Sequence, residues 1–196
     1  MSYQPQNFDH LLGTAGFSDD LLKNHFTLYQ GYVTNVQKLS DELRVLTDGG
    51  KIGTPEYNEL KRRFGWEFNG MRLHELYFEN MQKEEKTLDE MPTLQMNLEK
   101  NFGSFAAWQK DFKAVGSMRG IGWAILSEDP ATEQLFNVWI DEHDTGHLAG
   151  STPLLVLDVF EHAYLTDYGI KRADYLETFF RVIDWKIVED RFKKRG

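Results

Sequence analysis

One short apolar run that ends in a carboxylate constrains this chain more than any other feature. Residues 153–157 (PLLVL) have the composition of a fully buried strand, and Asp158 follows them directly. A charged carboxylate at the end of a buried strand is costly unless a positive charge lies against it. His162 comes four residues later, so its imidazole can converge with Asp158 from the first turn after the strand. Because Asp and His together suit Fe, Mn or Zn, the pair predicts a metal site, although an exposed Asp and a hydrogen-bonded His are the commoner explanation of such a pair.

Two long amphipathic patterns precede this segment and predict an antiparallel helical hairpin. The first begins at the N-cap Ser18 and ends before Gly49 and Gly50, and the second begins at Thr54 and Pro55. A loop this short places consecutive helices side by side. The apolar faces comprise His25, Leu28, Tyr32, Val36, Leu39, Leu43 and Leu46 in the first helix, and Tyr57, Leu60, Phe64, Phe68, Met71, His74 and Phe78 in the second. Each face therefore carries one histidine.

The rest of the chain predicts a second unit of mixed helix and strand. A polar stretch at 83–90 is the expected boundary, so we expect a helical hairpin domain at 1–90 and an α/β domain at 91–196. A helix is expected at 104–115, strands at 123–126, 135–140 and 154–157, and helical structure from 174 to 195. Few helices separate the strands, which favours a small antiparallel sheet.

The composition argues against several functional classes. The chain has 196 residues and no cysteine, which excludes disulfides, thiolate metal sites and thiol nucleophiles. A net charge of −9 without a long basic stripe argues against nucleic-acid binding. No apolar run approaches the roughly 18 residues of a membrane span, and the first residues lack a basic start and an apolar run. We therefore expect a cytoplasmic protein with no nucleic-acid or membrane partner.

Whether a histidine is interpreted as a ligand depends on the other candidate ligands expected near it. A single histidine on an apolar helix face is more often a core residue than a ligand. His25 and His74, however, lie on facing helices, and Asp158 and His162 add a carboxylate and a third imidazole from the other half of the chain. Hard, redox-active Fe or Mn suits this mixture of ligands, and the absence of thiolates argues against structural zinc.

Several motifs together resemble one known family. Residues 158–164 (DVFEHAY) resemble the D-x-W-E-H-A-Y signature of the iron/manganese superoxide dismutases. Further segments along nearly the whole chain are similar to the family's other landmarks: 73–78 (LHELYF), 101–105 (NFGSF), 120–124 (GIGWA), 171–176 (KRADYL) and 182–185 (VIDW). The resemblance implies an α+β fold, in which an N-terminal long α-hairpin is followed by a C-terminal α/β domain with a three-stranded antiparallel sheet, and the metal lies between them.

The resemblance also implies an antioxidant oxidoreductase, a superoxide dismutase. Such an enzyme disproportionates superoxide to dioxygen and hydrogen peroxide through redox cycling of one Fe or Mn ion per subunit. Carried over residue by residue, the metal ligands are His25, His74, Asp158 and His162. Tyr32 matches the tyrosine at the substrate gateway. His143 falls where many members have a Gln that bonds the metal-bound solvent, and we expect Tyr32 and His143 to relay protons.

Other positions carry over as surroundings of the site. Glu161 matches the residue that reaches a ligand histidine of the partner subunit, which implies a homodimer, and Tyr164 lies in the same motif. Arg172 matches a positive residue near the substrate entrance. The residues expected to keep the site dry are Trp123, Trp185 and Phe78.

The first helix departs from the family pattern. His25 and Tyr32 are seven residues apart, one fewer than in the family, but seven residues is close to two helical turns and keeps both side chains on one face. The family's longer spacing needs one extra helical residue, as a π-bulge provides. Leu28 and Leu165 replace a His and a Tyr that pair across the family's dimer, which we interpret as a compensated swap. Thr27 replaces a Lys near the entrance, which predicts weak electrostatic steering of the anion.

Two alternatives remain open from the residues alone. A two-His-one-carboxylate iron oxygenase would need an organic co-substrate and would leave one of the four supposed ligands dispensable. A catalytically impaired, metal-binding dimeric member of the same fold is suggested by the altered first helix. Iron and manganese both fit the ligand set.

Overall fold

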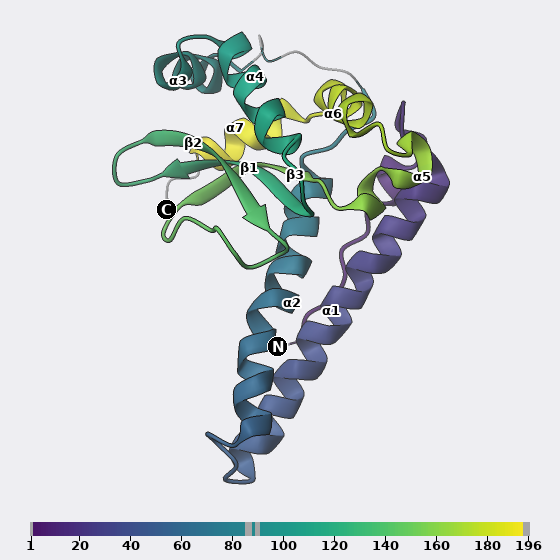
Figure 1. The fold of residues 1–196 in the computed structure, drawn as a ribbon, viewed down its shortest axis with the longest axis vertical. Coiled ribbons are helices and arrows are strands. Elements are labelled where there is room, and N and C mark those ends of the chain that lie inside the picture. The colour runs from purple at the N-terminus through teal and green to yellow at the C-terminus, as the bar shows by residue number, and fades with distance from the viewer. Residues whose placement is uncertain (1, 85–87, 89–90, 194–196) are drawn as a thin grey trace.

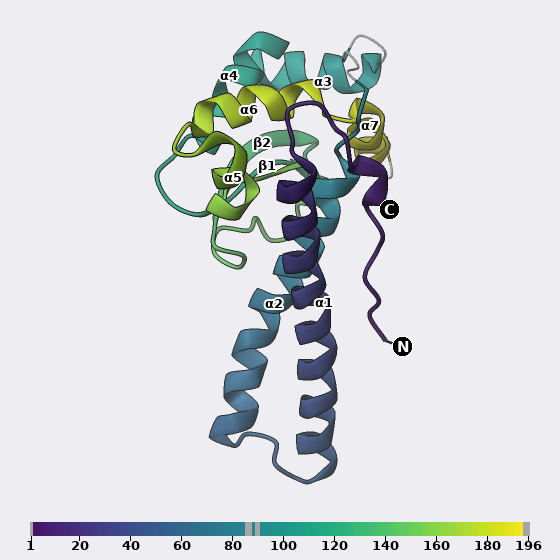
Figure 2. The same cartoon turned by 90° about the vertical axis from the view of Figure 1, so that its right-hand side faces the viewer.

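A long helical hairpin projects from a mixed α/β body (Figure 1). The computed structural model describes residues 2–84, 88 and 91–193. The hairpin consists of α1 (Asp19–Asp48) and α2 (Pro55–Glu79), which lie close together near their connecting loop and diverge toward the body in Figure 1; Figure 2 shows the same pair from the side. Among the described helices, none combines the length and apolar character that a bilayer crossing requires.

The two hairpin helices begin where their capping residues predict. The Ser18 hydroxyl accepts a hydrogen bond from the backbone N–H of Leu21 at 3.1 Å, and the Thr54 hydroxyl accepts one from Tyr57 at 3.3 Å. Pro55 occupies the first turn of α2, where its missing N–H costs nothing. The hairpin expected from the sequence is therefore present, and short-range signals account for both of its starts.

The body contains a three-stranded antiparallel sheet with helices packed around it. The strands are β1 (Gly122–Asp129), β2 (Gln134–Asp141) and β3 (Thr152–Asp158), in the order β2-β1-β3. The helices are α3 (Pro92–Phe102), α4 (Phe105–Gly116), α5 (Leu165–Tyr168), α6 (Arg172–Arg181) and α7 (Trp185–Lys193). The predicted α+β fold class is confirmed. Helix α3 was not predicted, because the sequence reading assigned its start to the boundary region.

The antiparallel register gathers the functional segments at one edge of the sheet. Strands β2 and β3 both run against the central strand β1, so their carboxyl ends lie beside its first residues. Trp123 on β1 pairs with Asp158 at the end of β3, and His143 follows two residues after β2. Three residues far apart in the chain are thereby brought to one place, which the hairpin then covers.

The predicted boundary between the two domains falls beside residues that lie outside the described part of the chain. These are residues 85–87, 89 and 90. The division into 1–90 and 91–196 therefore stays a prediction.

Gly122 tests how closely the backbones of β1 and β2 approach each other at this edge of the sheet. Its φ is +148°, and an added Cβ would lie 1.9 Å from the carbonyl oxygen of Ile140. Gly103 has φ +85°, but no atom lies within 4 Å of its Cβ position. We expect Gly122→Ala to lower the free energy of unfolding by about 3 kcal/mol, through clash and strain together. Gly103→Ala should cost only about 1 kcal/mol. Denaturant unfolding measures both, and equal losses would contradict the role of close backbone approach at Gly122.

Candidate metal centre

Four side chains from four separate elements converge on one point. His25 comes from α1, His74 from α2, Asp158 from the end of β3, and His162 from the short 3-10 helix η3 (Glu161–Ala163). One potential ligand atom from each residue lies within 4.8 Å of the others. The Asp158 Oδ2 atom is 3.1 Å from His25 Nε2, 3.1 Å from His162 Nε2 and 3.6 Å from His74 Nε2. These are the four residues that the sequence singled out as ligands.

The first helix reaches the centre without a bulge. Helix α1 is α-helical at every residue, and His25 is fully buried in it while the preceding Asn24 is exposed. Tyr32, two turns later, stacks on the ring of His74 with centroids 5.1 Å apart. The shorter spacing therefore suits a regular helix, as the sequence argument expected.

One position on the predicted face of α1 is placed differently by the structure. Leu28 was expected on the buried face, but it is exposed, and Tyr29 is buried instead. The buried stripe follows positions 25, 29, 33 and 36, so Leu28 falls at its edge. The Tyr29 hydroxyl donates a hydrogen bond to Glu75 Oε1 at 2.9 Å and accepts one from the N–H of Gln6 at 2.9 Å. A buried hydroxyl with two partners explains why Tyr29 rather than Leu28 faces inward.

The state of His74 indicates that a cation belongs at this point. Its Nδ1 lies 2.6 Å from the carbonyl oxygen of Gly70, which can only accept a hydrogen bond, so Nδ1 carries the proton. Burial holds the pKa of His74 well below its usual range, so the ring is neutral. Its Nε2 lone pair is buried, has no hydrogen-bond partner, and faces the Asp158 carboxylate. Two electron-rich atoms directed at each other in a dry interior require a positive charge between them.

The other donors agree with this assignment. Burial by itself would raise the pKa of Asp158, but the close approach of the His162 and His25 imidazoles, each 3.1 Å from Oδ2, outweighs burial and holds this pKa below its usual range. The Asp158 Oδ1 atom accepts the N–H of Phe160 at 2.8 Å, which leaves Oδ2 for the centre. Burial also lowers the pKa of His25. Three imidazoles and one carboxylate make a donor set that suits iron or manganese.

A chain of hydrogen bonds runs from the sheet to Tyr32. The Trp123 indole N–H donates to His143 Nδ1 at 3.0 Å, so the proton of the neutral imidazole sits on Nε2. His143 Nε2–H then donates to the Tyr32 hydroxyl oxygen at 2.8 Å. Burial lowers the pKa of His143 to about 4, so the ring is neutral at neutral pH, and the bond from Trp123 selects this tautomer. The Tyr32 hydroxyl proton is consequently free to point away from His143.

Trp66 and Glu142 lie beside this chain, and the sequence did not point to them. The Trp66 ring on α2 lies 4.5 Å from the His143 ring, edge to face, and its indole N–H donates to Glu142 Oε2 at 2.9 Å. This bond ties the hairpin to the loop after β2. The available signal was a tryptophan outside the predicted apolar face of its helix, among charged neighbours.

Comparison with known proteins agrees with this geometry. The family model of the C-terminal domain of iron/manganese superoxide dismutases matches residues 90–191. The chain is 37% identical to a superoxide dismutase [Mn] from Haloarcula marismortui, over 87% of this chain and 82% of that protein. It is 35% identical to superoxide dismutase [Mn] 2 from Haloferax volcanii, over 99% and 97%. It is 34% identical to a superoxide dismutase [Fe] from Aquifex pyrophilus, over 97% and 88%.

The chain belongs to the iron/manganese superoxide dismutase family. This membership confirms the resemblance seen in the sequence. It also confirms the predictions of an oxidoreductase that acts on superoxide and of iron or manganese as the metal.

The aromatic residues expected around a dismutase centre divide into two groups. Phe78 lies 4.9 Å from the ring of His25, and Trp123 lies 5.0 Å from that of His74. Trp185 is elsewhere: at the start of α7 it packs against Phe105 and Trp108, at 5.8 Å from each. None of the Trp185 ring contacts among the described residues involves the centre, so its expected part in excluding water receives no support from this placement.

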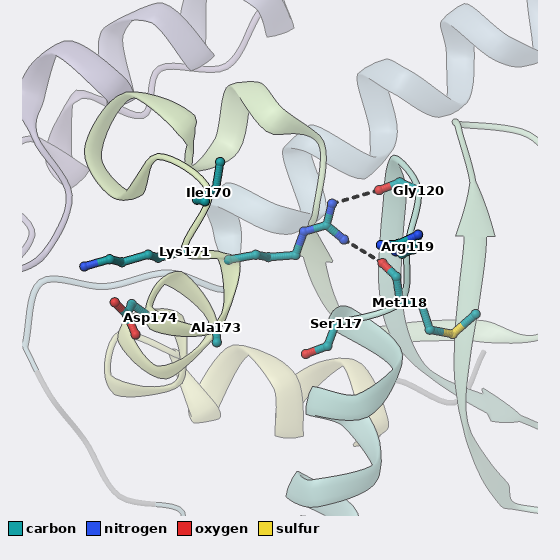
Figure 3. A pocket seen from close by; sticks show the side chains of 9 residues that line it. Ser117, Met118, Arg119, Gly120, Ile170, Lys171, Ala173 and Asp174 are labelled. Carbon is teal, nitrogen blue, oxygen red and sulfur yellow. Dashed lines mark hydrogen bonds between the residues drawn. The ribbon is translucent and has the colours of Figure 1, made fainter.

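Arg172 borders a cavity whose described lining does not include Tyr32. It borders a space of about 620 Å³ formed by the loop before β1 and the start of α6. Its guanidinium donates to the carbonyl oxygens of Met118 at 2.7 Å and Gly120 at 2.8 Å (Figure 3). It also donates to the Tyr164 hydroxyl at 3.1 and 3.2 Å. In this arrangement Arg172 joins α6 to the loop, and its place at the substrate entrance stays a prediction.

The buried histidines predict how stability depends on pH. Burial lowers the pKa values of His25, His74 and His143, whereas an unfolded histidine titrates near 6.5. Below that pH the unfolded chain binds more protons, so the free energy of unfolding of the metal-free protein should fall as pH drops from about 7 toward about 4. Denaturant unfolding at about pH 7.5 and about pH 5 measures the drop. His143→Gln should show a smaller drop in the free energy of unfolding than the unaltered protein, whereas the exposed His10→Gln should show the same drop. Equal drops in the unaltered protein and both variants would contradict the lowered pKa of His143.

Proposed function

We propose that this chain disproportionates superoxide at the centre formed by His25, His74, Asp158 and His162. In this reaction two superoxide anions and two protons give dioxygen and hydrogen peroxide. The observation that carries the proposal is the buried Nε2 lone pair of His74, which faces the Asp158 carboxylate with no hydrogen-bond partner. When bound there, iron or manganese supplies one-electron redox chemistry. The protein holds the donors in place and excludes water from three of the four.

Tyr32 and His143 serve the protonation of peroxide. Burial, reinforced by the charge of Asp158, raises the pKa of Tyr32, so its hydroxyl stays protonated at neutral pH. His143 Nε2–H donates to the Tyr32 oxygen, and this bond leaves the hydroxyl proton to be donated elsewhere. The tyrosine stacks on His74 and is therefore beside the centre. The Trp123 N–H holds His143 in the tautomer that the relay needs.

The two alternative functions that the sequence left open are less well supported. A two-His-one-carboxylate oxygenase would leave one ligand dispensable, whereas all four donor atoms lie within 4.8 Å of one another. The impaired member was suggested by the short spacing in α1, but a regular helix brings His25 and Tyr32 to the same centre. No described feature favours an impaired enzyme.

A homodimer completes the environment of His162. The side chain of His162 is 23% exposed, and its Nδ1 has no hydrogen-bond partner in the described part of this chain. Glu161 is exposed beside it, and its carboxylate likewise forms no hydrogen bond or ion pair among the described residues. Leu28 and Leu165 are exposed large apolar side chains. A second copy would supply Glu161 of the partner subunit to His162 and would cover these leucines. The cytoplasmic location stays a prediction from the sequence.

Metal loading tests the proposed function. The protein should be reconstituted separately with iron, manganese and zinc, and superoxide decay followed directly after rapid generation of the anion. We expect fast catalysed decay with iron, manganese or both. Zinc suits the same donors but does not change oxidation state, so the zinc protein is the matched inactive control. If iron and manganese at full occupancy were no better than zinc, the chain would be an impaired member of its family.

Tyr32→Phe tests the proton relay. Removal of the hydroxyl should slow turnover at high superoxide by at least about tenfold, because peroxide release then lacks its nearby acid. The metal content should be unchanged, since Tyr32 is not among the four clustered donors. Tyr29→Phe is the matched control: it removes another buried hydroxyl of α1, one bonded to Glu75 instead. A Tyr32→Phe enzyme as fast as the Tyr29→Phe enzyme would exclude the relay.

A further inference from the structure

A second cavity lies directly against the gateway tyrosine. It has a volume of about 300 Å³ and lies between the hairpin helices. Its walls include Leu28, Tyr32 and Asn35 from α1 and Arg63, Trp66 and Glu67 from α2. Since Tyr32 also stacks on His74, this cavity is separated from the metal centre by a single aromatic side chain. Any small solute that collects here is already beside the proton relay.

Arg63 is held in this wall by contacts on two sides. Its guanidinium carbon lies 3.8 Å above the centre of the Trp66 ring, which fixes the plane of the group. Its Nε and Nη2 atoms both donate to Glu67 Oε1, at 2.9 and 2.7 Å. A guanidinium has five N–H groups, and no further hydrogen bond of Arg63 is found among the described residues. The remaining N–H groups are available on a side chain that is 48% exposed.

The Glu67 carboxylate, which pairs with Arg63, already has hydrogen-bond partners within the cavity wall. The Glu67 side chain is 5% exposed, with Oε1 bonded to Arg63 and Oε2 accepting the Asn35 amide at 3.2 Å. Arg63 is the only cation among the described residues that line this cavity. The cavity therefore has a partly exposed guanidinium in its wall, next to apolar surface from Leu28 and Trp66. This is the arrangement that recognises a small anion at short range.

Arg172 offers less to an anion. Its guanidinium already donates to two backbone carbonyl groups and to the Tyr164 hydroxyl. It also borders the other cavity, whose described lining does not include Tyr32.

We propose that Arg63 is a substrate-binding residue, whose available N–H edge holds the superoxide anion beside Tyr32 before the anion enters the metal centre. This inference rests on the proposed function. Because Arg63 and Glu67 form a neutral pair, the attraction acts at short range and contributes little to long-range steering. Removal of the N–H edge should therefore slow capture of the anion at every ionic strength.

Three variants separate local binding from a general loss of positive charge. Arg63→Gln removes the edge and one charge. Arg63→Gln combined with Glu67→Gln removes the edge with no change in net charge, and it avoids leaving a buried carboxylate unpaired. Arg62→Gln is the matched control, since Arg62 is the neighbouring residue of α2, pairs with Glu59 and does not line the cavity.

The first measurement is the second-order rate constant for superoxide, taken at limiting substrate with the metal-loaded enzyme. Arg63→Gln and the double variant should both lower it by about three- to tenfold, and Arg62→Gln by less than about 1.5-fold. Equal losses in Arg63→Gln and Arg62→Gln, or an unaltered rate in the double variant, would overturn the proposal.

The second measurement needs neither metal nor turnover. The metal-free protein is titrated with azide or nitrate while the ¹⁵N–¹H resonance of the Arg63 side chain is recorded. A saturable shift that persists in Arg62→Gln supports the site, and the absence of a shift overturns it. If azide binds in this way but the unaltered metal-loaded protein does not consume superoxide, the anion site stands and the proposed function fails. If the unaltered enzyme is active and Arg63→Gln equals it, the function stands and this inference fails.

Discussion

The buried carboxylate of Asp158 is the constraint on which the rest of the structure depends. It lies in the dry interior, paired in the sheet with Trp123, and its own carbonyl accepts the Tyr175 hydroxyl at 2.7 Å. These bonds leave it no freedom to turn toward water. Three imidazoles from three other elements face its Oδ2 atom. An ionised group this deep requires compensation, and a metal ion compensates the carboxylate and the His74 lone pair together.

The same sheet edge also fixes the hydrogen bonds around Tyr32. The register that pairs Trp123 with Asp158 also directs the indole N–H at His143, and one hydrogen bond there decides the tautomer that faces Tyr32. The hairpin contributes Tyr32, and Trp66 ties the hairpin to the loop that carries His143. The four clustered donors and the hydrogen bonds from Trp123 through His143 to Tyr32 therefore depend on the same contact between hairpin and sheet. A displacement of the hairpin would disturb both, which explains why aromatic side chains are packed so densely between them.

The changes in the first helix are consistent with one another, and they do not disrupt the metal centre. A regular α1 keeps His25 and Tyr32 on the side that faces the centre despite the shorter spacing, and it turns Tyr29 inward, where Glu75 and the N–H of Gln6 satisfy its hydroxyl. Leu28 is left in the wall of the cavity between the hairpin helices, where it adds apolar surface. Among the described residues that line this cavity, the cation Arg63 comes from α2.

Short stretches of the chain were enough to predict the hairpin, from its caps and helical periodicity, and the residues with metal-binding chemistry, from the motif at 158–164 and the histidines on two apolar faces. They did not reveal α3, the inward turn of Tyr29 or the separate cluster of Trp185, because each depends on which neighbours fill the space around it. Tertiary contacts set the tautomers of His74 and His143, the bond between Trp66 and Glu142, and the orientation of Arg63. Those features arise where segments distant in the chain meet, and no local pattern encodes which of their atoms will face one another.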